Sequence, residues 1–277
     1  MALKKIVKES IPGFIPFFRR FKFSIRTFFL PRLRNINTLQ SADNLKLGSD
    51  EHGWTFLDKD YLYGSTILSV GLGEDASFDI EFCNRFASKV IIVDPTPRST
   101  RHFAEIAKHF GEERSADYTV GGKQLIQAYD LSKISNNNLV YIARALWKTT
   151  EEVQFFAPKN PEHTSYSITN LQGTNDSITV QALTYRDLLL EVNEKAENIK
   201  LLKLDVEGAA TEVISSILLS GFRPNQILVE FEELANLSVK NYRKLRNVSK
   251  LLIKSDYVLV FSDLQTNFTF ELVTSSN

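Results

Sequence analysis

The sequence has very little cysteine, with one residue, Cys83, in a chain of 277. A single cysteine excludes an internal disulfide. Its neighbours Ile80, Phe82 and Phe86 are apolar and no histidine is close to it in sequence, which indicates a buried thiol rather than a nucleophile. This cysteine usage is typical of the reducing cytoplasm, where we expect the protein to reside.

Long hydrophobic runs are also lacking. No apolar stretch approaches the roughly 20 residues that a membrane-spanning helix needs. The start of the chain does not resemble a secretory signal, because arginines interrupt every apolar stretch and no small-residue cleavage site follows. Internal repeats and long low-complexity linkers are absent, and 43% hydrophobic with 24% charged residues is ordinary for a globular protein. One large α/β domain with extensions is therefore expected.

The chain does have an uneven distribution of charge. Residues 1–34 contain nine Lys or Arg and one acid, a net charge of 9 − 1 = +8, so the other 243 residues sum to −8 in a chain that is neutral overall. Seven phenylalanines are interleaved with these cations, in GFIPFFRRFKFSIRTFFLPRLR. Two interpretations stay open: a segment that lies on an anionic membrane, at its inner face, or on an acidic partner, and a helical pair that packs on the main domain. Single-stranded nucleic acid is not expected as a partner, since such dense phenylalanine usually becomes buried.

Beyond this region the sequence alternates between strand and helix patterns. The polar stretch Asn37–Glu51 marks a boundary, which gives a basic, Phe-rich extension over 1–50 and a main domain over 51–277. Strands are predicted at Thr66–Val70, Lys89–Val93, Leu139–Ala143, Lys200–Leu204, Gln226–Phe231, Tyr257–Phe261 and Asn267–Leu272. Helices are predicted at Phe78–Phe86, Thr100–Phe110, Leu183–Glu194, Ala209–Leu219 and Val239–Lys254. This pattern predicts a doubly wound α/β fold with a mostly parallel seven-stranded sheet, whose last two strands form an antiparallel pair.

Glycines and acids gather where these strands end. In a doubly wound sheet the ligand lies at the carboxyl ends of the strands. The first strand ends in Gly71-Leu72-Gly73, the second in Asp94-Pro95, the fourth in Asp205-Val206-Glu207-Gly208 and the fifth in Glu230-Phe231-Glu232-Glu233. We therefore expect one edge of the sheet to be rich in carboxylates.

Gly71 to Ala76 fits the loose dinucleotide pattern G-x-G-x-x-A, and Asp94 stands 23 residues after Gly71, close to the spacing of an acid that binds ribose hydroxyls. A pyrophosphate needs free N–H groups and the positive end of a helix, which the acids Glu74 and Asp75 would oppose. S-adenosylmethionine has no phosphate and presents an ammonium, which an acid beside the turn can pair with. The motif therefore favours S-adenosylmethionine over a nicotinamide dinucleotide.

Four ordered blocks are similar to the FkbM family of S-adenosylmethionine-dependent methyltransferases, which have the class I, Rossmann-like fold. The blocks are SVGLGEDASFD, VIIVDPTPRS, ALWKTTEEVQFFAPKNPEHTSYSITN, and LLKLDVEGAATEVI followed by QILVEFEE. The resemblance implies O-methylation of hydroxyls on sugars, glycans, polyketides or related small molecules. It also implies that Gly71 and Gly73 lie along the methionine moiety and Asp94 on the ribose, and that Ala145 and Leu146 lie beside the adenine.

The sequence departs from its relatives at several positions. Ser69 stands where many class I methyltransferases have an acid, so Glu74 or Asp75 would have to bind the ammonium. Glu232 stands where a histidine is common in similar sequences, which excludes a histidine base at that place. Tyr166 replaces the histidine of an S-H-S triplet, and His163 is interpreted as an exposed loop residue.

Methyl transfer to a hydroxyl requires alignment and a group that takes the proton. Asp205, Glu207 and Glu230 are the predicted catalytic residues, although Asp205 or Glu207 could instead cap the helix that begins near Ala209. Three such carboxylates could hold Mg²⁺, but their spacing is not distinctive and no metal site is predicted. Two other functions stay open: a NAD(P)-dependent oxidoreductase that uses the same glycine turn, and a non-catalytic, membrane-associated glycan-binding module with a degenerate Rossmann core.

Overall fold

The structure is a computed structural model that describes residues 14–34, 43–157, 166–168, 174, 176–235 and 238–273. Residues 1–13 of the basic extension and His163 lie outside these ranges.

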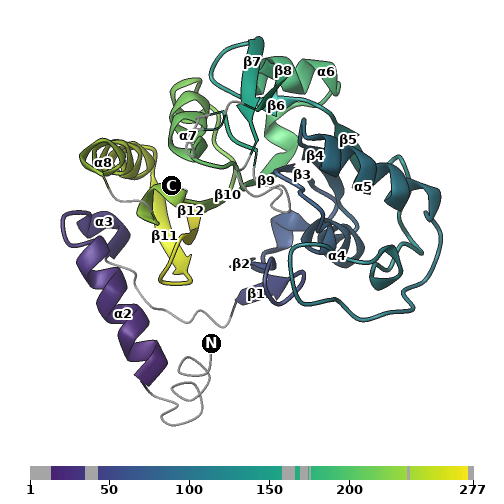
Figure 1. The fold of residues 1–277 in the computed structure, drawn as a ribbon, viewed down its shortest axis with the longest axis horizontal. Coiled ribbons are helices and arrows are strands. Elements are labelled where there is room, and N and C mark those ends of the chain that lie inside the picture. The colour runs from purple at the N-terminus through teal and green to yellow at the C-terminus, as the bar shows by residue number, and fades with distance from the viewer. Residues whose placement is uncertain are drawn as a thin grey trace.

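A seven-stranded sheet forms the centre of the molecule (Figure 1). Its order is β11-β12-β10-β9-β3-β4-β5; β12 runs antiparallel to both of its neighbours, β10 and β11, and the other neighbouring pairs are parallel. The strands are β3 (Thr66–Val70), β4 (Lys89–Val93), β5 (Leu139–Ile142), β9 (Ile199–Leu204), β10 (Gln226–Glu230), β11 (Tyr257–Ser262) and β12 (Asn267–Leu272). All seven predicted strands and the mostly parallel, doubly wound class are confirmed.

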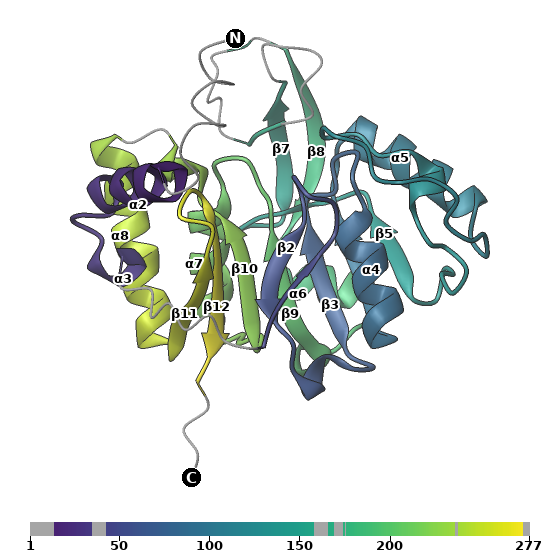
Figure 2. The same cartoon turned by 90° about the horizontal axis from the view of Figure 1, so that it is seen from below.

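Helices cover both faces of this sheet (Figures 1 and 2). They are α4 (Ser77–Phe86), α5 (Pro97–Lys108), α6 (Tyr185–Glu191), α7 (Ala210–Leu219) and α8 (Val239–Lys254), with short 3-10 turns at Asp60–Leu62, Ile126–Ala128, Ala196–Asn198 and Glu232–Leu234. Alternate residues of a strand face opposite sides, so Ile67 packs in the cluster under α4 and α5 while Leu68 packs in the cluster under α6, α7 and α8. Strands buried on both faces explain the continuous apolar runs.

Two smaller sheets were not predicted. A hairpin pairs β1 (Asn44–Leu47) with β2 (Trp54–Leu57), and the predicted boundary after residue 50 falls in its turn. Gln226 fixes β2 to the start of β10, since its side chain accepts from Leu57 N and donates to Leu57 O, both at 2.9 Å. The second sheet has the order β6-β8-β7 and consists of β6 (Ala145–Leu146), β7 (Glu151–Phe156) and β8 (Ser177–Leu183).

The basic extension contributes α2 (Phe14–Arg26) and α3 (Pro31–Arg34). One face packs on the domain, where Phe23, Leu30 and Leu33 are buried and the Phe23 and Phe268 rings lie 6.1 Å apart. Phe21 is 55% exposed on the same helix. No helix among the described residues is both long enough and apolar enough to cross a membrane. The packing interpretation therefore accounts for one face of α2 and leaves the other face to be explained.

We expect Phe23→Ala to lower the free energy of unfolding by about 3 kcal/mol, because it leaves a cavity against Phe268. The exposed Phe21→Ala should change it by no more than about 0.5 kcal/mol. Urea unfolding followed by circular dichroism measures both. Equal effects of the two substitutions would show that α2 does not belong to the core.

Candidate functional site

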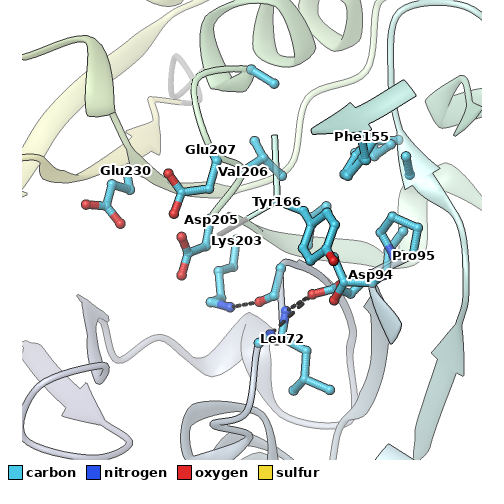
Figure 3. A pocket seen from close by; sticks show the side chains of 18 of the residues that line it. Leu72, Asp94, Pro95, Phe155, Tyr166, Lys203, Asp205, Val206, Glu207 and Glu230 are labelled. Atoms are coloured by element: carbon cyan, nitrogen blue, oxygen red, sulfur yellow. Dashed lines mark hydrogen bonds between the residues drawn. The ribbon is translucent and has the colours of Figure 1, made fainter. Parts of the chain in front are cut away.

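A cavity of about 220 Å³ opens where β3, β4, β9 and β10 end. All eleven sequence-predicted site residues line this cavity. They are Gly71, Leu72, Gly73, Glu74, Asp94, Pro95, Ala145, Leu146, Asp205, Glu207 and Glu230. Figure 3 shows Asp205, Glu207 and Glu230 on one side of the cavity and Asp94 with Pro95 on the other. The fold therefore brings together all the residues that sequence reasoning selected.

Close approach between β3 and β9 explains the first glycine of the turn. Gly71 has φ +90°, and a Cβ at this position would lie 2.0 Å from the carbonyl oxygen of Asp205. The two strand ends are joined by a hydrogen bond from Asp205 N to Val70 O at 2.9 Å. Any side chain at residue 71 would push the glycine turn away from Asp205, so the residue sets the width of the site.

Asp94 organises the glycine turn. Its Oδ2 accepts hydrogen bonds from Leu72 N at 2.9 Å, Gly73 N at 3.2 Å and Ser99 Oγ at 2.7 Å, and its Oδ1 accepts from Thr96 N at 2.8 Å. The two turn amides that a pyrophosphate would need thus already donate to a carboxylate. A ligand without phosphate fits this turn, and Oδ1, which among the described residues accepts from Thr96 N alone, is the oxygen able to accept from a ribose hydroxyl.

The two acids after the turn have partners within the protein. Glu74 forms ion pairs with Arg98 at 3.3 Å and Lys123 at 3.4 Å. Asp75 accepts from Ser49 Oγ at 2.7 Å and from Ser77 N at 2.8 Å, at the start of α4. The charge of Glu74 is therefore balanced by two cations, and Asp75 ties the β1–β2 hairpin to α4.

The buried cation Lys203 supports the backbone of the glycine turn. Lys203, 4% exposed, donates to Gly71 O at 2.6 Å and lies 5.6 Å from the centre of the Trp54 ring. Asp79 of α4 is fully buried nearby, and burial raises the pKa of its carboxyl, which the Lys203 charge partly opposes. Lys203, near the carboxyl end of β9, therefore holds the backbone of the glycine turn.

Three of the acids at the ends of β9 and β10, Asp205, Glu230 and Glu232, have raised pKa values. Burial raises the pKa of Glu230 to about 7, with further contributions from Asp205 and Glu207. Burial and the Glu207 carboxyl raise the pKa of Glu232 to about 9, and burial raises that of Asp205. Thr266 Oγ1 donates to Glu230 at 2.8 Å. Protons are therefore shared among these carboxyls near neutral pH, which suits them to accept and release a proton.

Sequence reasoning missed the aromatic walls of the cavity. These are His52 and Trp54 from the β1–β2 hairpin, and Trp147 and Phe155 from the β6-β8-β7 region. Tyr166, noted only as a replacement, points into the cavity beside Asp94 (Figure 3). The alternation in NLKL, WTFL, EEVQFF and SITVQAL was the signal that could have identified the strands beside them.

The part of the chain that the structure describes contains no group of three or more His, Cys, Asp or Glu arranged to hold a metal ion.

Gly71→Ala should be far more damaging than Gly111→Ala. Both residues have positive φ, +90° and +94°, so alanine is strained at each by roughly 1 to 2 kcal/mol. Only at residue 71 does the new Cβ also meet backbone, and we expect this clash to cost about 2 kcal/mol more in the free energy of unfolding. Denaturant unfolding of the two variants measures the difference, and equal losses would contradict the close approach.

Glu230 and Glu232 should make the protein less stable as the pH rises from about 4.5 to about 9. Their folded pKa values, about 7 and about 9, lie above the ordinary value of 4.5, so their contribution to stability is full below pH 4.5, falls as the pH rises toward each folded pKa, and is lost above it. The melting temperature of Glu230→Gln/Glu232→Gln should decline less steeply over this pH range than that of the wild type. The control Glu113→Gln/Glu197→Gln, at exposed acids, should keep the wild-type slope.

Comparisons with known proteins give a family and solved structures of low sequence identity. No curated protein matches the sequence. Among solved structures, methyltransferase FkbM from Methylobacillus flagellatus KT is 8% identical with a TM-score of 0.45, over 75% of this chain and 43% of that one. The SAH-bound methyltransferase PaMTH1 of Podospora anserina is 10% identical with a TM-score of 0.37, over 76% and 72%. The fibrillarin pre-rRNA processing protein of Methanococcus jannaschii is 8% identical with a TM-score of 0.37, over 86% of each chain.

This chain spans less than half of the Methylobacillus protein. The model of the methyltransferase FkbM domain matches residues 88–250, which is more than half of the present chain and includes Asp94, the β6-β8-β7 sheet and the acids at the ends of β9 and β10. The chain therefore belongs to the FkbM methyltransferase family, and its cofactor is S-adenosylmethionine.

Proposed function

We propose that this protein transfers a methyl group from S-adenosylmethionine to a hydroxyl of a sugar, glycan or other small molecule. The observation that supports O-methylation most directly is the group of carboxyls at the ends of β9 and β10, where Glu230 has a pKa of about 7. A hydroxyl must lose a proton as it is methylated, and a carboxylate with this pKa accepts one at neutral pH.

The donor end of the cavity is assigned to the glycine turn and Asp94. S-adenosylmethionine supplies a methyl group already activated by a positively charged sulfur. Asp94 Oδ1 accepts from a ribose hydroxyl, while Leu72, Pro95, Ala145 and Leu146 provide the apolar surfaces around the nucleoside. Because Glu74 is paired with Arg98 and Lys123, the carboxylates across the cavity are the better partners for the donor's positive charges.

The acceptor end is assigned to Asp205, Glu207 and Glu230. The hydroxyl oxygen forms a bond to the methyl carbon as the carbon–sulfur bond breaks, the sulfur keeps the electron pair, and the hydroxyl proton passes to a carboxylate of this group. Ser167 Oγ donates to Glu207 O at 2.6 Å, so the short segment at Tyr166 is held over the acids. The aromatic walls align the two reactants and exclude water.

Neither of the other two functions fits as well. A nicotinamide dinucleotide would need the turn amides that Asp94 accepts from, and it does not match the methyltransferase family. In a degenerate binding module bulky side chains would fill the donor site, whereas here Gly71 and Gly73 border a cavity.

Asp94→Ala should weaken the binding of S-adenosylhomocysteine at least about tenfold, since each charge-assisted hydrogen bond is worth roughly 1.5 to 3 kcal/mol. Glu105→Ala, on the exposed face of α5, is the control, because among the described residues Glu105 pairs with Lys108 and His109 at the surface. Isothermal titration calorimetry measures both variants. Small, equal changes would remove Asp94 from the donor site.

Asp205→Asn and Glu207→Gln should each lower turnover by about 10² or more with little change in melting temperature, and Asp205 should have the larger effect. A helix cap would behave in the opposite way, with a loss of roughly 0.5 to 2 kcal/mol of stability and intact chemistry. The assay is transfer of labelled methyl from S-adenosylmethionine to a panel of sugars, glycans and small alcohols, with products identified by mass spectrometry. Transfer to amines or thiols alone would refute O-methylation.

A further inference from the structure

The outer face of α2 and α3 combines exposed apolar and basic side chains. Phe21, Ile25, Phe28 and Phe29 are 55%, 61%, 60% and 71% exposed, although Phe23 on the same helix is 4% exposed. The exposed side chains cannot be explained by core packing, because the packed face lies on the other side of the helix. Apolar side chains of this size gathered on one surface mark a site of interaction.

The cations of this face are Arg19, Arg20, Lys22 and Arg32, all exposed. Within the described part of the chain none of them has an ion-pair partner. Residues 14–34 contain no acid. The positive charge of this segment is therefore available to an external anion.

Helix α8 extends the same surface. Its sequence, VKNYRKLRNVSKLLIK, has six basic residues and no acid. Lys240, Arg243, Arg246 and Lys250 are exposed, while Leu245, Val248 and Leu252 face the core. The spacing of these four cations by three or four residues places Arg243, Arg246 and Lys250 on one side of the helix.

Tyr242 joins the two basic segments. Its hydroxyl accepts from Phe29 N at 3.0 Å and donates to Arg26 O at 3.3 Å, and its ring lies 6.2 Å from that of Phe29. Figures 1 and 2 both show α3 next to α8, and α2 leads into α3. We use the term basic helix surface for the exposed apolar and basic residues described above, which come from α2, α3, α8 and the turn between α2 and α3.

We propose that the basic helix surface docks on an anionic phospholipid membrane. Cations attract the headgroups, and exposed Phe and Ile side chains enter the boundary between headgroups and acyl chains. Nucleic acid would account for the cations but not for Ile25, which cannot stack on bases as an aromatic ring does. The absence of any acid in either segment gives the surface the charge complementarity that such a membrane requires.

Docking here would place the active site at the membrane. Phe23 anchors α2 to Phe268, and Phe268 pairs with Val229, the residue before Glu230. The surface is thus fixed at the end of the sheet where the cavity has its acids. The proposal does not depend on which acceptor is methylated.

The test is flotation of the full chain with vesicles of phosphatidylcholine, with and without about 30% phosphatidylglycerol. We expect the protein to float with the anionic vesicles, to stay behind with the neutral ones, and to be released by about 0.5 M salt. Arg243→Glu/Arg246→Glu/Lys250→Glu should lower the partition coefficient about 100-fold. Phe21→Ser/Ile25→Ser/Phe28→Ser should lower it at least about tenfold, because apolar contact with the lipid is lost.

Two control variants carry substitutions of the same kind at exposed residues outside the basic helix surface. Arg101→Glu/Lys133→Glu/Lys195→Glu reverses three exposed cations elsewhere, and Leu190→Ser/Leu219→Ser removes two exposed apolar side chains, 71% and 76% exposed. Both should float as the wild type does. Melting temperature and S-adenosylhomocysteine binding, which should be unchanged in all four variants, distinguish lost docking from lost folding or lost cofactor.

Several results would overturn the proposal. The proposal fails if the wild-type protein does not bind anionic vesicles, or if it binds neutral vesicles equally well. It also fails if either surface variant is folded and still partitions onto anionic vesicles as the wild type does, or if the protein binds single-stranded RNA more tightly than vesicles.

Discussion

One buried carboxylate, Asp94, holds the donor end of the site together. It joins the end of β4 to the turn after β3 and to the first turn of α5, through hydrogen bonds to three backbone amides and one hydroxyl. A carboxylate at this place satisfies amides that would otherwise be buried without partners, so the turn keeps its shape before any ligand arrives. It also makes the turn a poor phosphate site, and a phosphate-free donor therefore fits it.

The charges of the molecule are separated by function. Acids gather at the ends of β9 and β10, where the pKa values of Glu230 and Glu232 are raised, while cations without ion-pair partners among the described residues gather on α2, α3 and α8. The formal net charge of zero conceals both groups. Between them, Lys203 is a cation kept inside, where it binds Gly71 O and opposes the raised pKa values of Asp79 and Asp205. Its burial has a structural reason, since the turn and the acids both need a positive charge at the centre of the sheet.

The sequence predicts the central sheet well because its signals are local. Continuous apolar runs identify strands such as β4, and acids that follow them must meet at one edge of a parallel sheet. The hairpin β1–β2 was missed because its strands have only four residues each and β1 lies in a polar stretch that resembles a linker. Strands β7 and β8 were missed because they are largely half-exposed or exposed and lack the continuous apolar runs of the central strands. Ion pairs between residues far apart in sequence also cannot be predicted from local patterns. Nothing near Glu74 in the sequence shows that Arg98 and Lys123 balance its charge.

The parts of the site that were predicted and the parts that were missed have different tasks. The predicted parts, the glycine turn and the acids, lie at the strand ends of the central sheet and are the parts to which we assign methyl transfer. The missed parts, among them Trp54, Trp147 and Phe155, come from the smaller sheets and form the walls against which an acceptor must fit. A fold can keep the first group fixed while the walls vary in shape, because the walls rest on strands that are not part of the central hydrogen-bonded sheet. Selectivity for the acceptor is therefore expected to reside in these walls, and the family resemblance, which rests on the strand ends, identifies the donor and leaves the acceptor open.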